Sequence, residues 1–211
     1  MIRSALISVL AASTLLSACG RSAGPPTAGN EAASNAPATH SADAEMAGPF
    51  AADEHAMSAA MMKSVGADVS DTWVKTMIEH HHGAISMSKT VLTQSPPADV
   101  RKMAQSIIAK QTAEIDKLNK MLSSRPPEQS SMEPYHAAMT AMDNAMMAAQ
   151  GANASETYLR KMLAHHKGAV AMSEIVLKSS SDPKIKNAAA TIKADQTREI
   201  RDTEAMLGSA H

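Results

Sequence analysis

The chain has 211 residues, and 20 Lys and Arg stand against 21 Asp and Glu, so the net charge is −1. A protein so close to neutral has no bulk field that would gather nucleic acid, which excludes that class of partner. Aromatic residues make up 2% of the chain, too few for the core of a β-sandwich or barrel, whereas the 17 methionines favour helix. The composition therefore predicts an all-α protein.

The N-terminus has the pattern of an export signal that ends in a lipid anchor. An apolar run of about a dozen residues follows Arg3, shorter than the roughly 20 that a bilayer span needs. It ends in Leu-Ser-Ala-Cys, which resembles a bacterial lipobox with Cys19 as the lipidated residue. We expect residues 1–18 to be a lipoprotein signal peptide and the protein to face the periplasm, touching the membrane through this anchor alone. The alternative is an ordinary cleaved signal in which Cys19 has no function.

Residues 19–48 are small and polar, with almost no large apolar side chains. Such a segment cannot bury enough surface to offset its ordering entropy, so it is predicted to be a disordered tether. If Cys19 is lipidated, the mature chain has no free thiol, and soft-metal chemistry has to use thioether and imidazole.

The remaining sequence is an internal duplication. Residues 49–122 align without a gap on residues 134–207, at a spacing of 85, and about 30 of the aligned pairs are identical. Residues 123–133 form a linker, and the two repeats are expected to make one domain.

Each repeat is predicted to contain three helices. The first is short, over 51–65 or 136–150, and in the first repeat it ends at Gly66. The second is long, with Ser70 or Ser155 as its N-cap and an acidic residue in its first turn. The third begins near Pro97, or at Asp182 and Pro183.

A helical projection indicates which polar residues point inward. On the second helix His81 falls within the apolar stripe and His80 at its edge, while His82 faces the opposite way. On the third helix Gln111 and Glu114 fall among apolar residues. Buried ionisable groups are costly unless they are hydrogen-bonded, paired or bound to metal. Each repeat thus offers an inward His, Gln and Glu near two methionines. The methionines near the His pair are Met77 and Met87, and the corresponding residues of the second repeat are Met162, His165, His166, Met172, Gln196 and Glu199.

Simpler interpretations remain open for each of these residues. Methionine at helical spacing is often core filler. His81, Gln111 and Glu114 can form a structural network without metal. Gly83 and Gly168, inside the long helices, are explained most simply by close helix contact.

The paired motifs resemble the domain-of-unknown-function 305 (DUF305) family. The first is Met-x-x-His-His-x-x-Ala-x-x-Met, running from Met77 to Met87, and the second is Gln-x-x-Glu-Ile, starting at Gln111; both return 85 positions later. The resemblance covers nearly all of residues 70–207. It implies a ferritin-like four-helix bundle with two helices from each repeat, to which the short helices are additions. The family includes periplasmic copper-binding members.

The ligand types indicate which metal such a site prefers. A di-iron or di-manganese bundle needs about four inward carboxylates, and only Glu114 and Glu199 point inward here. Thioether with imidazole suits Cu(I) and Ag(I), and imidazole also accepts Cu(II). The expected metal ligands are His80, His81, Met77, Met87, His165, His166, Met162 and Met172, with Gln111, Glu114, Gln196 and Glu199 orienting the imidazoles and Met57, Met61, Met142 and Met146 as possible extra thioethers.

The sequence therefore predicts a non-enzymatic envelope lipoprotein that binds copper for buffering, tolerance or delivery to a protein partner. A helical lipoprotein whose polar core only fixes helix register is the second hypothesis. A ferritin-like di-metal redox enzyme is the third.

Overall fold

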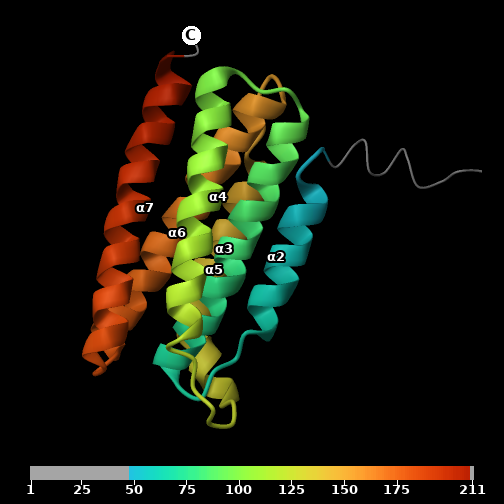
Figure 1. Ribbon diagram of the computed structural model, residues 1–211. Coiled ribbons are helices and arrows are strands. Elements are labelled where there is room, and N and C mark those ends of the chain that lie inside the picture. The colour runs from blue at the N-terminus through green and yellow to red at the C-terminus, as the bar shows by residue number, and fades with distance from the viewer. Residues whose placement is uncertain (1–47, 210–211) are drawn as a thin grey trace, which may run out of the picture. The chain divides into compact units, whose positions relative to one another are not determined.

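The computed structural model describes residues 48–209, and all regular structure in that range is helical, which confirms the predicted fold class (Figure 1). The expected signal peptide and Cys19, with the tether up to residue 47, lie outside the described residues. The helices are α2 (Ala51–Lys63), α3 (Val69–Thr93), α4 (Ala98–Asn119), the 3₁₀ turn η1 (Gln129–Met132), α5 (Glu133–Ala148), α6 (Ala154–Ser179) and α7 (Pro183–Ser209).

The two long helices α3 and α6 pack against each other at the centre of the bundle. On α3 lie α4 and α2, and on α6 lie α7 and α5, while α2 and α5 also touch each other. On α3, Gly83 faces α2 whereas His81 faces α4. At about 100° per residue these two positions are about 200° apart, so α2 and α4 cover opposite sides of α3.

The long helices begin two residues before the position that the sequence suggested. Asp68, not Ser70, is the N-cap of α3, and its carboxylate accepts a hydrogen bond from Asp71 N at 3.0 Å. Asn153, not Ser155, caps α6 in the same way through Glu156 N. Both caps have extended backbone angles, which let the side chain reach the free amides of the first turn. The acidic residue expected in that turn is present in both helices.

The other helix ends lie close to their expected positions. Pro97 precedes α4 and Pro183 begins α7, as predicted. Helix α2 ends at Lys63, two residues before the expected limit. Helix α5 starts at Glu133, three residues earlier than expected, because η1 runs directly into it and Pro134 suits the first turn of a helix.

Local contacts recur 85 residues apart in the chain. Gly66 N donates to the Thr72 hydroxyl at 2.8 Å, and Gly151 N donates to the Thr157 hydroxyl at 3.0 Å. Each bond closes the turn that leads into a central helix. None of the helices within residues 48–209 is both long and apolar enough to cross a membrane.

Candidate metal centre

Two histidines from different halves of the chain meet where α3 packs on α6. The rings of His80 and His165 are stacked, with their centroids 3.5 Å apart and 30° between their planes. Both side chains are completely buried. The helical projection placed His80 at the edge of the apolar stripe and gave no sign that it lies against His165.

Each of these two rings is bonded to the backbone of the opposite helix. His80 Nε2 donates to the carbonyl oxygen of His165 at 3.0 Å, and His165 Nε2 donates to that of His80, also at 3.0 Å. A carbonyl oxygen only accepts, so Nε2 carries the proton in both rings and Nδ1 carries a free lone pair. Neither Nδ1 atom has a hydrogen-bond partner.

The neighbouring histidines face glutamates on the outer helices. His81 Nε2 lies 2.7 Å from Glu114 Oε2 of α4. His166 Nε2 lies 3.7 Å from Glu199 Oε2 of α7, and Lys110 Nζ reaches across from α4 to the other oxygen of Glu199 at 3.2 Å. The two halves therefore differ, because the lysine draws Glu199 away from its histidine. The Nδ1 atoms of His81 and His166 are also buried without a partner.

Burial keeps the imidazoles of His80, His165 and His166 neutral. It is the largest cause that holds the pKa of His80 and His165 well below the usual value of 6.5, and each ring's histidine neighbours lower the pKa further. Burial likewise lowers the pKa of His166 to about 3, against an opposing contribution from Gln196. Burial raises the pKa of Glu199, and Lys110 opposes this. A neutral imidazole is the form that binds metal, so these three rings do not need to lose a proton first.

The predicted glutamines and methionines are all buried around this centre. Gln111 and Gln196 are each 1% exposed, and both polar side-chain atoms of Gln111 lack a hydrogen-bond partner. The four methionines of the long helices are at most 1% exposed and belong to the same apolar core. These four are Met77, Met87, Met162 and Met172.

The short helices bring further thioethers against the long ones. The sulfur of Met57 occupies the space beside Gly83, only 2.2 Å from where a Cβ at that position would lie. Met142 fills the corresponding space beside Gly168, at 2.4 Å. The glycines thus serve close helix contact, the simpler of their two explanations. Met61 and Met146 are buried as well.

Other residues near the centre were missed by the sequence analysis. Ser88 and Tyr158 share a buried hydrogen bond of 2.7 Å between α3 and α6, and burial raises the pKa of Tyr158. Their counterparts 85 positions away, Ser173 and Trp73, make no such bond. The replacement of tryptophan by tyrosine at one aligned position was the available signal.

Within residues 48–209 no three His, Cys, Asp or Glu side chains converge in an arrangement that could hold one ion. The bare Nδ1 atoms are therefore nitrogen donors that need other ligand types to complete a site. The methionine sulfurs are the soft donors that share this core.

Comparison with known proteins agrees with the fold. A crystal structure of a DUF305 fragment from Deinococcus radiodurans aligns over 67% of this chain and 96% of its own, with a TM-score of 0.51 and 24% sequence identity. No curated protein matches the chain. The sequence profile of the domain of unknown function DUF305 matches residues 13–122 and 123–207. Because these matches cover nearly the whole chain, the protein belongs to the DUF305 family.

Proposed function

We propose that this protein is a non-enzymatic lipoprotein of the cell envelope that binds copper as Cu(I), and buffers it or passes it to a protein partner. The proposed ligands are Nδ1 atoms of the four buried histidines together with sulfurs of Met77, Met87, Met162 and Met172. Lipidation at Cys19 would hold the domain at the membrane.

The observation that carries this proposal is the set of four buried imidazoles whose Nδ1 atoms have no hydrogen-bond partner. Leaving a polar atom buried and unpartnered costs about 1–3 kcal/mol. A purely structural polar core would be expected to satisfy those atoms. A soft cation would satisfy them, and the burial that keeps His80 and His165 neutral removes proton competition at these two rings.

The donor chemistry favours Cu(I) over harder ions. Imidazole nitrogen and thioether sulfur, without thiolate, are ligands that Cu(I) and Ag(I) accept. Glu114 and Glu199 already face the Nε2 atoms of His81 and His166, which is where a carboxylate orients a ligating imidazole. These glutamates therefore suit an orienting role better than direct coordination.

Anaerobic titration of the full chain with Cu(I) against a chromophoric chelator tests the proposal. Changing Met77, Met87, Met162 and Met172 to Leu keeps the core volume but removes the sulfurs. This set should weaken Cu(I) binding by at least about tenfold, because even the partners of metal ligands contribute that much. Met132→Leu, another buried methionine, is the matched control and should bind Cu(I) as the wild type does.

A second variant removes the Nδ1 atoms of two histidines while it keeps a side chain that can make the same backbone contact. Glutamine in place of His80 and His165 retains an N–H donor near the position of Nε2 but has no equivalent of Nδ1. This double variant should keep its fold and lose Cu(I) affinity. If the wild type binds no Cu(I), or if this variant and the leucine set bind it as tightly as the wild type, the proposed site is wrong.

A structural role is the second candidate function. The reciprocal bonds between His80 and His165 tie α3 to α6 at one register without any metal. On this alternative the protein is a helical interaction module, and Cu(I) leaves its thermal midpoint unchanged. A rise in the midpoint with added Cu(I) would favour metal binding.

A further inference from the structure

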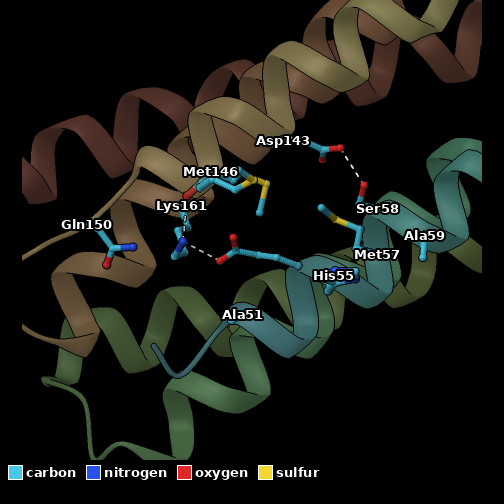
Figure 2. A pocket seen from close by; sticks show the side chains of 11 residues that line it. Ala51, His55, Met57, Ser58, Ala59, Asp143, Met146, Gln150 and Lys161 are labelled. Atoms are coloured by element: carbon cyan, nitrogen blue, oxygen red, sulfur yellow. Dashed lines mark hydrogen bonds and ion pairs between the residues drawn. The ribbon is translucent and has the colours of Figure 1, made fainter. Parts of the chain in front are cut away.

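A pocket of about 410 Å³ lies between the short helices α2 and α5, apart from the histidine centre (Figure 2). Two thioethers, from Met57 of α2 and Met146 of α5, line it, and Figure 2 shows both extending into the space between the two helices. His55 and Met147 also line the pocket, and the side chain of Met147 is 68% exposed. Soft donors therefore extend from the surface into the pocket.

Two polar contacts frame the pocket. The Ser58 hydroxyl donates to Asp143 Oδ2 at 2.7 Å and joins α2 to α5. Lys161 Nζ lies 2.6 Å from Glu54 Oε1 and donates to the carbonyl oxygen of Met146 at 2.8 Å. Both contacts hold the two helices at the spacing that leaves the pocket open.

The charges on the pocket wall favour a cation. Two carboxylates, Glu54 and Asp143, stand against one ammonium, Lys161. The local balance is therefore negative, and a cleft lined mainly by one sign of charge concentrates ions of the other sign.

The pocket lies between the two halves of the molecule, and its lining is not symmetric. The residues 85 positions from Glu54 and Lys161 are Met139 and Thr76, so the ion pair has no equivalent in the other half. Met57 lines the pocket, whereas Met142, its counterpart 85 positions later, does not. The pocket thus distinguishes two methionines that are otherwise equivalent in packing.

Met57 connects the pocket with the histidine centre. The same side chain that lines the pocket places its sulfur beside Gly83 of α3. Gly83 is three residues after His80, about 4.5 Å along the helix axis and about 60° around it. The Met57 sulfur therefore lies beside a position of α3 that is about one helical turn from His80, whose Nδ1 has no partner.

From this arrangement we infer that the pocket between α2 and α5 is the loading site for Cu(I), and that Met57 passes the ion from the pocket to His80. This inference rests on the proposed function of the histidine centre. In the transfer, the bond from Cu(I) to the Met57 sulfur breaks as a bond to His80 Nδ1 forms. Copper remains Cu(I), and no proton is released because Nδ1 carries none.

The test is the rate of Cu(I) uptake by the full chain under anaerobic conditions. Cu(I) is supplied as its acetonitrile complex, and free ion is captured at timed intervals with a chromophoric chelator. Met57→Leu should load at least about tenfold more slowly than the wild type, since it removes a soft ligand from the path and raises the barrier. Met142→Leu is the matched control, because this methionine packs on Gly168 in the same way but lies outside the pocket. It should load at the wild-type rate.

A second pair of variants blocks the pocket without touching a sulfur. Ala59 is an exposed residue of the pocket wall, and Ala59→Phe should slow loading while leaving the final Cu(I) affinity unchanged. Its counterpart is Asn144, which is exposed and lies outside the pocket, so Asn144→Phe should load normally.

The outcomes distinguish this inference from the proposed function. If the wild type binds Cu(I) tightly but Met57→Leu and Ala59→Phe load at its rate, the loading pocket is wrong and the histidine centre stands. If Met142→Leu slows loading as much as Met57→Leu, Cu(I) does not enter only through the pocket that Met57 lines, and the loading pocket is wrong. If the wild type binds no Cu(I), the proposed function itself fails.

Discussion

At the scale of single residues, the chemistry of the histidine centre depends on which nitrogen of each ring is engaged in a hydrogen bond. The backbone carbonyls take Nε2–H of His80 and His165, so the free lone pair of each of these two rings is on Nδ1. A helical projection can place a histidine inside the core, but it cannot assign the ring atom that stays free. That assignment depends on a carbonyl group 85 residues away.

Protonation of these rings makes the stability of the copper-free protein depend on pH. The pKa values of His80, His165 and His166 are lowered in the folded state, so below about pH 6.5 the unfolded chain binds more protons than the folded one. Stability should therefore fall as the pH falls below about 6.5, by up to about 1.4 kcal/mol per pH unit for each ring. For His166 the loss continues down to its folded pKa of about 3.

Two carboxyl groups act in the opposite direction. Burial raises the pKa of Glu54 and Glu199 in the folded state, so protonation of these groups favours folding as the pH falls. Urea unfolding of copper-free protein between pH 7.5 and 5.5 measures the net effect. In the variant with glutamine at positions 80 and 165, the free energy of unfolding should depend less steeply on pH. A slope equal to that of the wild type would contradict this account.

Gly83 is a second residue whose role depends on tertiary contact. In an isolated helix Gly83→Ala should be stabilising by about 1 kcal/mol. Here the new Cβ would lie 2.2 Å from the Met57 sulfur, and overpacking of this kind costs about 1–3 kcal/mol. We expect Gly83→Ala to lower the free energy of unfolding in the wild type and to lower it by less in a Met57→Ala background, where only the Met57 Cβ, 2.9 Å from the new Cβ, remains in the way.

A double-mutant cycle in urea measures this reduction in the cost of Gly83→Ala. Gly168→Ala with Met142→Ala is the matched cycle in the other half and should behave in the same way. If Gly83→Ala has the same effect with and without the Met57 side chain, close packing is not the reason for the glycine.

At the scale of the helices, the caps of α3 and α6 show how local signals compete. Each helix is preceded by two residue types that can cap it, Asp68 and Ser70 or Asn153 and Ser155. The earlier residue is the cap in both cases. The carboxylate of the acidic residue three positions later accepts a hydrogen bond from the backbone amide of the residue before the cap, which fixes the start of the helix. Asp71 and Glu156 accept from Ala67 N and Ala152 N at 2.9 and 2.8 Å.

The start of α6 allows this choice of cap to be tested by mutation. Asn153→Ala should lower the free energy of unfolding by about 1 kcal/mol, since it removes the acceptor for Glu156 N. Ser155→Ala is the control and should change it by less than about 0.5 kcal/mol. Thermal unfolding of the two variants decides between them, and a larger loss in Ser155→Ala would restore the cap expected from the sequence.

At the scale of the whole molecule, two similar halves surround a centre that is not fully symmetric. The clearest difference is the buried ion pair of Glu54 and Lys161, whose positions in the other half are held by Met139 and Thr76. The pair joins α2 to α6 beside the loading pocket. An ion pair taken out of water gains little net stability, but removing one partner leaves the other charge uncompensated.

Replacing Glu54 and Lys161 with the residues at the aligned positions of the other half tests how the ion pair contributes to stability. Lys161→Thr alone should cost about 3 kcal/mol, because Glu54 is left without its partner in a mostly buried position. Lys161→Thr together with Glu54→Met should recover most of that loss, or exceed the wild-type stability. Chemical denaturation measures both variants. If the double variant is less stable than Lys161→Thr alone, an uncompensated charge on Glu54 is not the reason for the loss.

The sequence by itself determined the helical class, the limits of the two repeats in the alignment, the inward histidines and the family, because composition, periodicity and motif spacing are properties of the chain. Only the tertiary structure decided that His80 stacks on His165, that Lys110 draws Glu199 from His166, and that Met57 and Met142 occupy the space at the glycines. Each of these contacts joins different helices, and helical periodicity gives the direction of a side chain without naming the helix it will meet.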